Sequence, residues 1–138
     1  MFVEEMQTKI DSLFVEAEII DVSCNNFSKD VKIIYGVDGN NTEKIQYHFS
    51  GCIKVEFFFL PSDEEINNVD EKTRCYLQRV IVKDFNEDVK KWANIKGGVD
   101  IKTKFYKCYI DMYPLEAKIL FANMKLNRIM PDGTIIEV

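Results

Sequence analysis

The sequence lacks the residue patterns on which most catalytic and metal sites depend. It has one histidine, His48, and its cysteines are far apart, without a CxxC pair. One imidazole and scattered thiols do not give the ligand spacing of a zinc site, so neither a metal nor a cofactor is expected. The glycines of "KGGVD" (Lys96–Asp100) match neither a P-loop nor a dinucleotide fingerprint. The sequence therefore predicts no catalytic residues.

The sequence also lacks a long apolar run and an excess of basic charge. No stretch approaches the roughly 20 apolar residues that span a bilayer, and the first residues do not resemble a secretory signal. We therefore expect reduced cysteines and a cytoplasmic location. The net charge of −5 over 138 residues argues against general nucleic-acid binding, which needs a basic face, and is compatible with a basic protein partner. A chain of this length is expected to form a single domain, residues 1–138.

The N-terminal segment predicts an amphipathic helix. Its apolar residues recur at spacings that place them on one face. These residues are Phe2, Met6, Ile10 and Leu13. Glu4 and Glu5 lie in the first turn, where the helix dipole favours negative charge. The pattern predicts that this helix ends near Phe14.

Alternating segments after this helix predict strands. The segment "EIIDVSC" places Ile20, Val22 and Cys24 on one face, and "VKIIYGV" (Val31–Val37) alternates in the same way. An Asp-Gly pair follows Val37 and is a strong hairpin signal. We therefore expect Val31–Val37 to pair antiparallel with a strand that begins near Lys44.

The longest alternating segment is "KIQYHFSGCIKVEFFF", Lys44–Phe59. As one straight strand it would extend roughly 53 Å, whereas a compact chain of this size is roughly 37 Å across. Gly51 lies on the apolar face in the middle of the segment, where glycine permits a sharp bend. The pattern predicts one long coiled strand that bends at Gly51. A hairpin at Ser50-Gly51 is the alternative.

The middle of the chain predicts a connection, a strand and a short helix. Pro61–Lys72 is a polar, acidic connection, and a strand follows at Val80–Val82. Asp84 and Glu87 fit a capping box at the start of a helix. That helix would place Phe85, Val89 and Trp92 on one face and end at Gly97-Gly98.

The C-terminal part predicts further strands. "IKTKFYKCYIDMY" alternates as a strand, and a short strand closes the sequence after the turn at Pro131–Gly133. The segment 115–129 fits either a helix that begins after Pro114 or a strand. We favour a strand, because it would complete a meander with the preceding one. The predicted fold is α+β: an N-terminal helix packed on a strongly twisted, mainly antiparallel sheet of about seven strands. Whether this sheet closes into a barrel is left open.

Two groups of polar residues are candidates for a binding surface. The polar connection carries a cluster of acids: Asp63, Glu64, Glu65, Asp70 and Glu71. Neighbouring carboxylates on one loop do not face each other across a cleft, as glycosidase chemistry requires, so a solvated surface or a docking patch for a basic partner is expected. His48 lies on the polar face of the long strand beside Ser50, but no acid is placed to orient it as a general base.

Three consecutive phenylalanines, Phe57, Phe58 and Phe59, raise a separate question. In a strand, Phe58 must point opposite to its neighbours. Either the N-terminal helix buries Phe58, which we favour, or Phe58 is an exposed anchor for another chain.

Several segments resemble small bacterial immunity-type proteins of polymorphic-toxin systems. They are "FVEAEIIDV" (Phe14–Val22), "DVKIIYGV" (Asp30–Val37), "YHFSGC" (Tyr47–Cys52) and "YKCYIDMYPLEAKILFANMKL" (Tyr106–Leu126). Where that group has His-Asp near the start, this chain has Val15-Glu16. The resemblance implies a protein that binds and neutralises a cognate toxin and needs no catalytic residues.

The resulting hypothesis is a non-enzymatic protein-binding domain of the immunity type. Its expected contact surface is the acidic loop together with His48. The alternative is a β module that binds a small ligand or forms a homo-oligomer. An enzyme that uses His48 is the least favoured interpretation.

Overall fold

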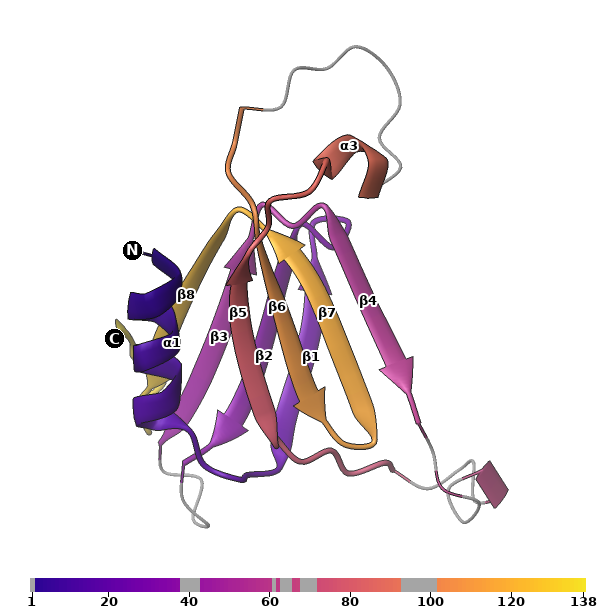
Figure 1. Cartoon of the computed structure of the whole chain (residues 1–138). Helices are drawn as coiled ribbons and strands as arrows, with labels where there is room; N and C mark the ends of the chain where they lie inside the picture. Colours follow the sequence, from indigo (N-terminus) through magenta and orange to yellow (C-terminus); the bar gives the residue numbers. More distant parts are fainter. Residues whose placement is uncertain (1, 38–42, 61, 63–65, 68–71, 93–101) are drawn as a thin grey trace.

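The computed structural model describes residues 2–37, 43–60, 62, 66–67, 72–92 and 102–138 (Figure 1). Within these residues, antiparallel strands form two sheets that lie one in front of the other, with a helix along one side. The five-stranded sheet has the order β1 (Ile19–Asn25), β2 (Asp30–Gly36), β3 (Lys44–Ser50), β8 (Asn123–Ile129), β9 (Ile135–Glu137). The four-stranded sheet has the order β4 (Lys54–Phe59), β7 (Leu115–Phe121), β6 (Tyr106–Met112), β5 (Arg79–Asp84). The predicted α+β class is confirmed.

The main hydrophobic core lies between the two sheets. It is built from the alternate, inward-facing side chains of strands in both sheets, so each sheet buries one face against the other. The largest fully buried side chains include Tyr35, Tyr47, Phe49 and Phe121. Phe49 and Phe121 pack edge to face across the two sheets, with ring centroids 5.0 Å apart.

Helix α1 (Phe2–Leu13) packs along the side of the molecule at β5 (Figure 1). The predicted apolar face is confirmed, because Met6 and Ile10 are buried in the core and Phe2 and Leu13 pack against it. The Tyr35 hydroxyl donates a hydrogen bond to the Leu13 carbonyl at 2.8 Å and so ties the end of the helix to β2. The predicted end of the helix near Phe14 is also confirmed.

Gln7 of α1 takes the place of a neighbouring strand at the edge of β5. Its Nε2 donates to the Val80 carbonyl at 3.0 Å, and its Oε1 accepts from the Val82 N–H at 2.9 Å. A side-chain amide has one donor and one acceptor arranged like those of a peptide group, so it satisfies two outward groups of the edge strand. The helix thereby closes this edge to other chains.

The segment Lys44–Phe59 bends at Gly51 as predicted, but it forms two strands, not one. β3 pairs with β8 in one sheet, and β4 pairs with β7 in the other. Lys44–Phe59 and its antiparallel partner, residues 115–129, therefore form a two-stranded ribbon. Both strands of the ribbon leave one sheet and enter the other at the same point.

The bend contains an extra residue on one strand. Ser50 pairs with Asn123 and Lys54 pairs with Leu120, so Gly51–Ile53 lie opposite Phe121 and Ala122 alone. The Ala122 N–H lies 3.2 Å from both the Ser50 and the Gly51 carbonyl oxygens. Such a β-bulge increases the local bend and twist of the ribbon.

The strand count differs from the prediction for the same reason. The structure has nine strands in the described ranges, rather than about seven, because two long segments are each divided between the sheets. The segment 115–129 is strand, as favoured, but it breaks at Ala122 into β7 and β8. The predicted meander is confirmed, because β6 pairs antiparallel with β7.

Two further predictions are corrected. Ile20, Val22 and Cys24 do not share one face, because the register of β1 shifts between Ile19 and Asp21 and leaves Ile20 outside the ladder. Ile20 is exposed as a result, whereas Val22 and Cys24, opposite Ile33 and Val31, still share a face.

The predicted capping box is also wrong. Helix α3 (Val89–Trp92) begins after Asp88, whose carboxylate accepts from the Lys90 N–H at 3.1 Å, whereas Asp84 ends strand β5. Val89 and Trp92 nevertheless pack beside Phe85, as the spacing predicted. The predicted end of this helix at Gly97-Gly98 lies outside the described residues.

Candidate protein-binding surface

A ridge of exposed apolar side chains follows the outer edge of the four-stranded sheet. The ridge consists of Phe57, Phe58, Phe59 and Leu60, whose exposed fractions are 38%, 43%, 47% and 54%. Tyr113, at the turn that joins β6 to β7, is also exposed. Consecutive large apolar residues on an edge strand are unusual in a protein that has no partner, because such edges recruit other chains.

The register explains why these residues are exposed on both faces of β4. Phe57 pairs with Ala117 and Phe59 with Leu115, so these two rings point toward the inner side of the sheet. Phe58 pairs with Glu116 on the outer side. β4 is the last strand of its sheet, and in Figure 1 it lies at the outer edge, on the side away from α1.

The outward main-chain groups of β4 are a second feature of this ridge. The Leu60 N–H donates to the Pro114 carbonyl at 2.8 Å in the same register, so even-numbered residues face β7. In an antiparallel ladder the intervening residues, Val55, Phe57 and Phe59, then point their N–H and C=O groups away from the sheet. The opposite edge of this sheet differs, because Gln7 bonds to β5 there.

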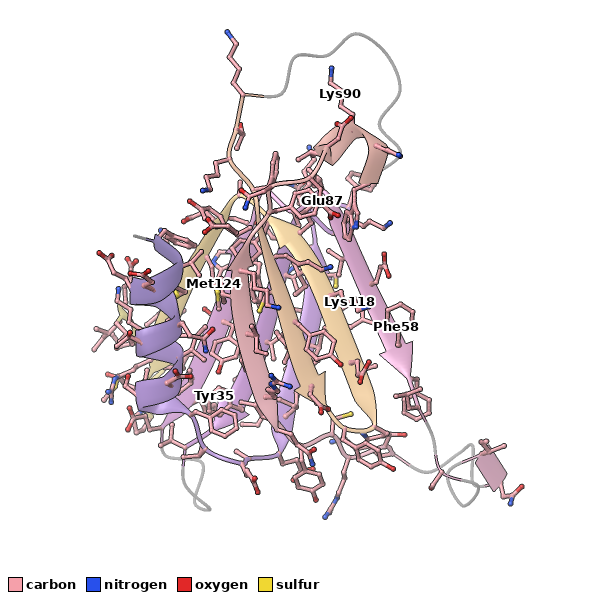
Figure 2. All side chains as sticks on the ribbon, in the orientation of Figure 1. Tyr35, Phe58, Glu87, Lys90, Lys118 and Met124 are labelled. Carbon is pink, nitrogen blue, oxygen red and sulfur yellow. The ribbon has the colours of Figure 1, made fainter. Side chains whose placement is uncertain are left out.

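The predicted burial of Phe58 under the N-terminal helix is wrong. Helix α1 contacts β5, at the other edge of the sheet. Phe58 is instead half-exposed beneath the ammonium group of Lys118, which lies 5.4 Å from the ring centroid (Figure 2). The alternative interpretation, an exposed aromatic anchor, agrees with this position.

The outer face of the four-stranded sheet carries a basic hollow next to the ridge. The hollow has a volume of about 290 Å³. It is lined by Arg79, Ile81, Lys83, Lys107, Tyr109 and Lys118. These residues come from β5, β6 and β7, and the cross-strand register places them side by side.

His48 lies on the other sheet, away from this hollow. It is paired with Lys32 on β2 and Lys125 on β8, and its Nε2 is 3.6 Å from an Asp30 carboxylate oxygen. Nε2 is buried and has no hydrogen-bond partner among the described residues. Ser50, two residues along β3, does not contact His48 in any hydrogen bond between described residues, so the structure does not assemble a Ser–His pair there.

The predicted acidic surface lies outside the described residues. It consists of Asp63, Glu64, Glu65, Asp70 and Glu71. They follow β4 directly in the sequence, so they continue the chain from the end of the apolar ridge.

The buried ionisable groups belong to the core. Burial, together with the nearby Asp30 carboxylate, raises the pKa of the Cys52 thiol to about 12. Burial also raises the pKa of Cys108 and of Tyr47. A thiol with a raised pKa is a poor nucleophile, so these cysteines suit packing better than catalysis. No group of three or more metal-binding side chains occurs in the described part of the chain.

Comparison with known protein families identifies the group to which the chain is related. A sequence profile described as immunity protein PIM7 matches residues 2–128, which is nearly the whole chain. The chain belongs to the PIM7 family of immunity proteins. A search of curated proteins found no match.

Family membership confirms the resemblance seen in the sequence and points to a role in countering a toxin. The match includes β1 to β7 completely and β8 except its last residue, so both sheets are part of the family's shared region. No helix in the described residues is long and apolar enough to cross a membrane.

The sequence offered some indication of the apolar ridge but none of the basic hollow. The run "FFFL" was visible as a cluster, but its exposure followed only from the position of β4 at a sheet edge. The lysines of the hollow are far apart in the sequence. They become neighbours only once the pairing of β5, β6 and β7 is known, and no sequence pattern marked them.

Proposed function

We propose that the chain binds and neutralises a cognate toxin by direct contact, without a chemical step of its own. Family membership supports the toxin-countering role, and the exposed ridge Phe57–Leu60 is the observation that supports binding. Aromatic side chains are enriched in the buried centres of protein interfaces, where a few of them provide most of the binding free energy. The inward position of the core thiols gives no support to a catalytic alternative.

The first experiment identifies the toxin and tests protection. The tagged chain is used to capture proteins from a lysate of its host, and any stoichiometric partner is expressed in a test strain with and without the chain. We expect the partner alone to stop growth and the chain to restore it. If no captured partner is toxic, or if the chain does not protect against it, the proposed function is wrong. Capture of only a second copy would favour the homo-oligomeric module.

Substitutions on the ridge test where the toxin binds. Phe58→Ser combined with Leu60→Ser should weaken the complex by about tenfold or more, because both side chains are exposed apolar anchors. The matched control is Phe27→Ser: Phe27 is 100% exposed in the turn between β1 and β2. That turn lies near the start of β4, where the Cys52 N–H donates to the Lys29 carbonyl, and not near its end at the ridge. Equal affinities for the ridge variant and wild type would exclude the ridge from the interface.

The acidic loop and His48 are proposed as secondary contacts and enter the same binding assay. Replacing Asp63, Glu64, Glu65, Asp70 and Glu71 with Ser should slow association and reduce its dependence on salt, because exposed charges act mainly on the association rate. An unchanged association rate would remove the loop from the interface. His48→Ala should leave the fold and protection nearly intact, because a secondary contact adds little to the total affinity, and loss of protection by a folded His48→Ala variant would show that His48 is a primary contact.

A further inference from the structure

The outer face of the four-stranded sheet has a charge pattern that folding does not explain. Lys83 and Lys107 lie directly opposite each other on β5 and β6. Lys118 lies opposite Tyr109, which is two residues from Lys107 on the same face. Like charges directly across a sheet destabilise it, so this arrangement costs the fold stability.

No ion pair between described residues includes Lys83, Lys107 or Lys118, and the one carboxylate directly opposite them, Glu56 opposite Lys118, is instead paired with Lys54. Two of these three lysines lie over aromatic rings: the Lys107 ammonium is 5.4 Å from the Trp92 ring centroid, and that of Lys118 is 5.4 Å from the Phe58 centroid. Other lysines of the same region differ. The Lys54 ammonium is 3.2 Å from a Glu56 carboxylate oxygen, and the Lys104 ammonium is 2.9 Å from an Asp84 carboxylate oxygen.

The basic hollow also opposes the charge of the whole molecule. It is lined by Arg79 and the three lysines, with no carboxylate among its lining residues, whereas the chain has a net charge of −5. The apolar side chains of Ile81 and Tyr109 form part of the lining. A hollow with four cationic groups on an acidic protein is complementary to a carboxylate-bearing segment.

The surroundings of the hollow favour separate carboxylates over a long polyanion. On the same outer face, Asp111 lies opposite Arg79, Glu116 lies opposite Asp111, and Glu56 lies opposite Lys118. These acids would repel a continuous phosphate backbone that extended beyond the hollow. A protein segment can place its carboxylates over the lysines and other side chains over the acids.

We propose that this hollow binds an acidic segment of the protein partner. The inference rests on the proposed function and adds the chemistry of the partner's contact surface. Lys118 connects the hollow to the ridge through its contact with Phe58, so the hollow and the outward-facing part of the ridge form one continuous face. The partner would then place an apolar patch on the ridge and acidic side chains in the hollow.

A short oligoglutamate peptide tests the hollow without requiring the toxin. In an NMR titration of the intact chain at low ionic strength, we expect the resonances of Lys83, Lys107, Lys118 and Tyr109 to shift, and the affinity to fall as salt is added. The triple variant Lys83→Gln, Lys107→Gln and Lys118→Gln should bind the peptide about tenfold more weakly or not at all. It should also unfold at an equal or higher urea concentration, because repulsion between the lysines is removed.

A matched variant on the other sheet controls for total charge. Lys32→Gln, Lys44→Gln and Lys125→Gln remove the same number of lysines from β2, β3 and β8 and should retain peptide binding. Unmoved resonances with the peptide, or equal binding by the first triple variant, would overturn the proposal. Tighter binding of a single-stranded oligothymidylate than of the peptide at these residues would also overturn it, in favour of nucleic acid.

The growth assay separates the two ideas. If the Lys83, Lys107 and Lys118 triple variant protects as well as the wild-type chain does, the hollow is not part of the interface, although the proposed function stands. If the peptide binds but the chain protects against no captured partner, the proposed function fails, whereas recognition of acidic peptides by the hollow is supported.

Discussion

At the scale of single residues, Gly51 determines how the chain passes between the two sheets. Its backbone has φ of +61°, a conformation that side chains with a Cβ rarely adopt. A Cβ at this position would also lie 2.8 Å from the Cβ of Ala122, which is closer than such atoms approach. The bend therefore depends on the absence of a side chain for two separate reasons.

Gly51→Ala should lower the free energy of unfolding by about 2 to 4 kcal/mol, from backbone strain and overpacking together. Urea unfolding followed by circular dichroism measures this loss. Gly133→Ala is the matched control: Gly133 also has a positive φ, +87°, but a Cβ added there would have no heavy atom within 4 Å beyond its chain neighbours. It should cost only about 1 kcal/mol.

A second substitution separates strain from overpacking. Adding Ala122→Gly to the Gly51→Ala variant removes the close contact but leaves the positive φ, so it should restore part of the lost stability. If Gly51→Ala and Gly133→Ala cost the same, contact with Ala122 does not contribute to the requirement for glycine.

At the scale of elements, the two edges of the four-stranded sheet differ in whether another element covers them. Gln7 of α1 covers the β5 edge with two hydrogen bonds, whereas β4 presents the ridge at the other edge. This contrast indicates that the fold protects one edge and leaves the other available for a partner.

Gln7→Ala should destabilise the protein by about 1 to 3 kcal/mol, because the Val80 carbonyl and the Val82 N–H lose their partners in a partly buried position. Hydrogen exchange of the Val82 amide should accelerate. Thr8→Ala is a suitable comparison, since the Thr8 hydroxyl donates only to the Glu4 carbonyl at an exposed position. Unchanged exchange at Val82 would show that the side chain of Gln7 does not protect this edge.

Periodicity in the sequence was sufficient to predict α1, the β2–β3 hairpin and the bend at Gly51, because each depends on residues close together in the chain. It was not sufficient to predict the extra residue in β1 or the division of residues 115–129, because both depend on pairing with another strand. The prediction that α1 buries Phe58 was wrong for a related reason. The sequence shows that two faces exist, but not which edge of the sheet the helix covers.

At the scale of the whole molecule, the candidate binding face joins elements that are remote in sequence. The ridge was visible as a run of phenylalanines, but the basic hollow combines side chains from β5, β6 and β7. The net charge of −5 did not indicate the basic hollow, because a total charge contains no information about where positive side chains lie on the surface. The acidic loop remains a prediction from the sequence.

The buried thiols make the stability of the whole molecule sensitive to alkaline pH. Burial raises the pKa of Cys52 from 9.0 to about 12 and also raises that of Cys108. Because the unfolded chain loses these protons at a lower pH than the folded chain does, stability should be complete below pH 9 and fall as the pH rises toward 12. Urea midpoints measured under reducing conditions across this range test the expectation.

The control for this measurement removes both thiols. A Cys52→Ala and Cys108→Ala variant should start from a lower stability, because two buried side chains are shortened, but lose less of it as the pH rises. An equal loss in the variant and the wild-type chain would assign the alkaline transition to other groups, such as Tyr47.

The paired strands that join the two sheets also determine when the chain can complete its fold during synthesis. β3 pairs with β8, and β4 pairs with β7, so these two pairs cannot form until β7 and β8 have been synthesised. Lys44 pairs with Ile129, and Phe59 pairs with Leu115. A chain still attached to the ribosome therefore exposes the core-facing side chains of β3 and β4 until most of the sequence has been translated. Contacts between such distant residues also slow folding. A chain that ends before Leu115 therefore lacks the strand against which the ridge is held, and the candidate binding face exists only in molecules whose synthesis has passed β7.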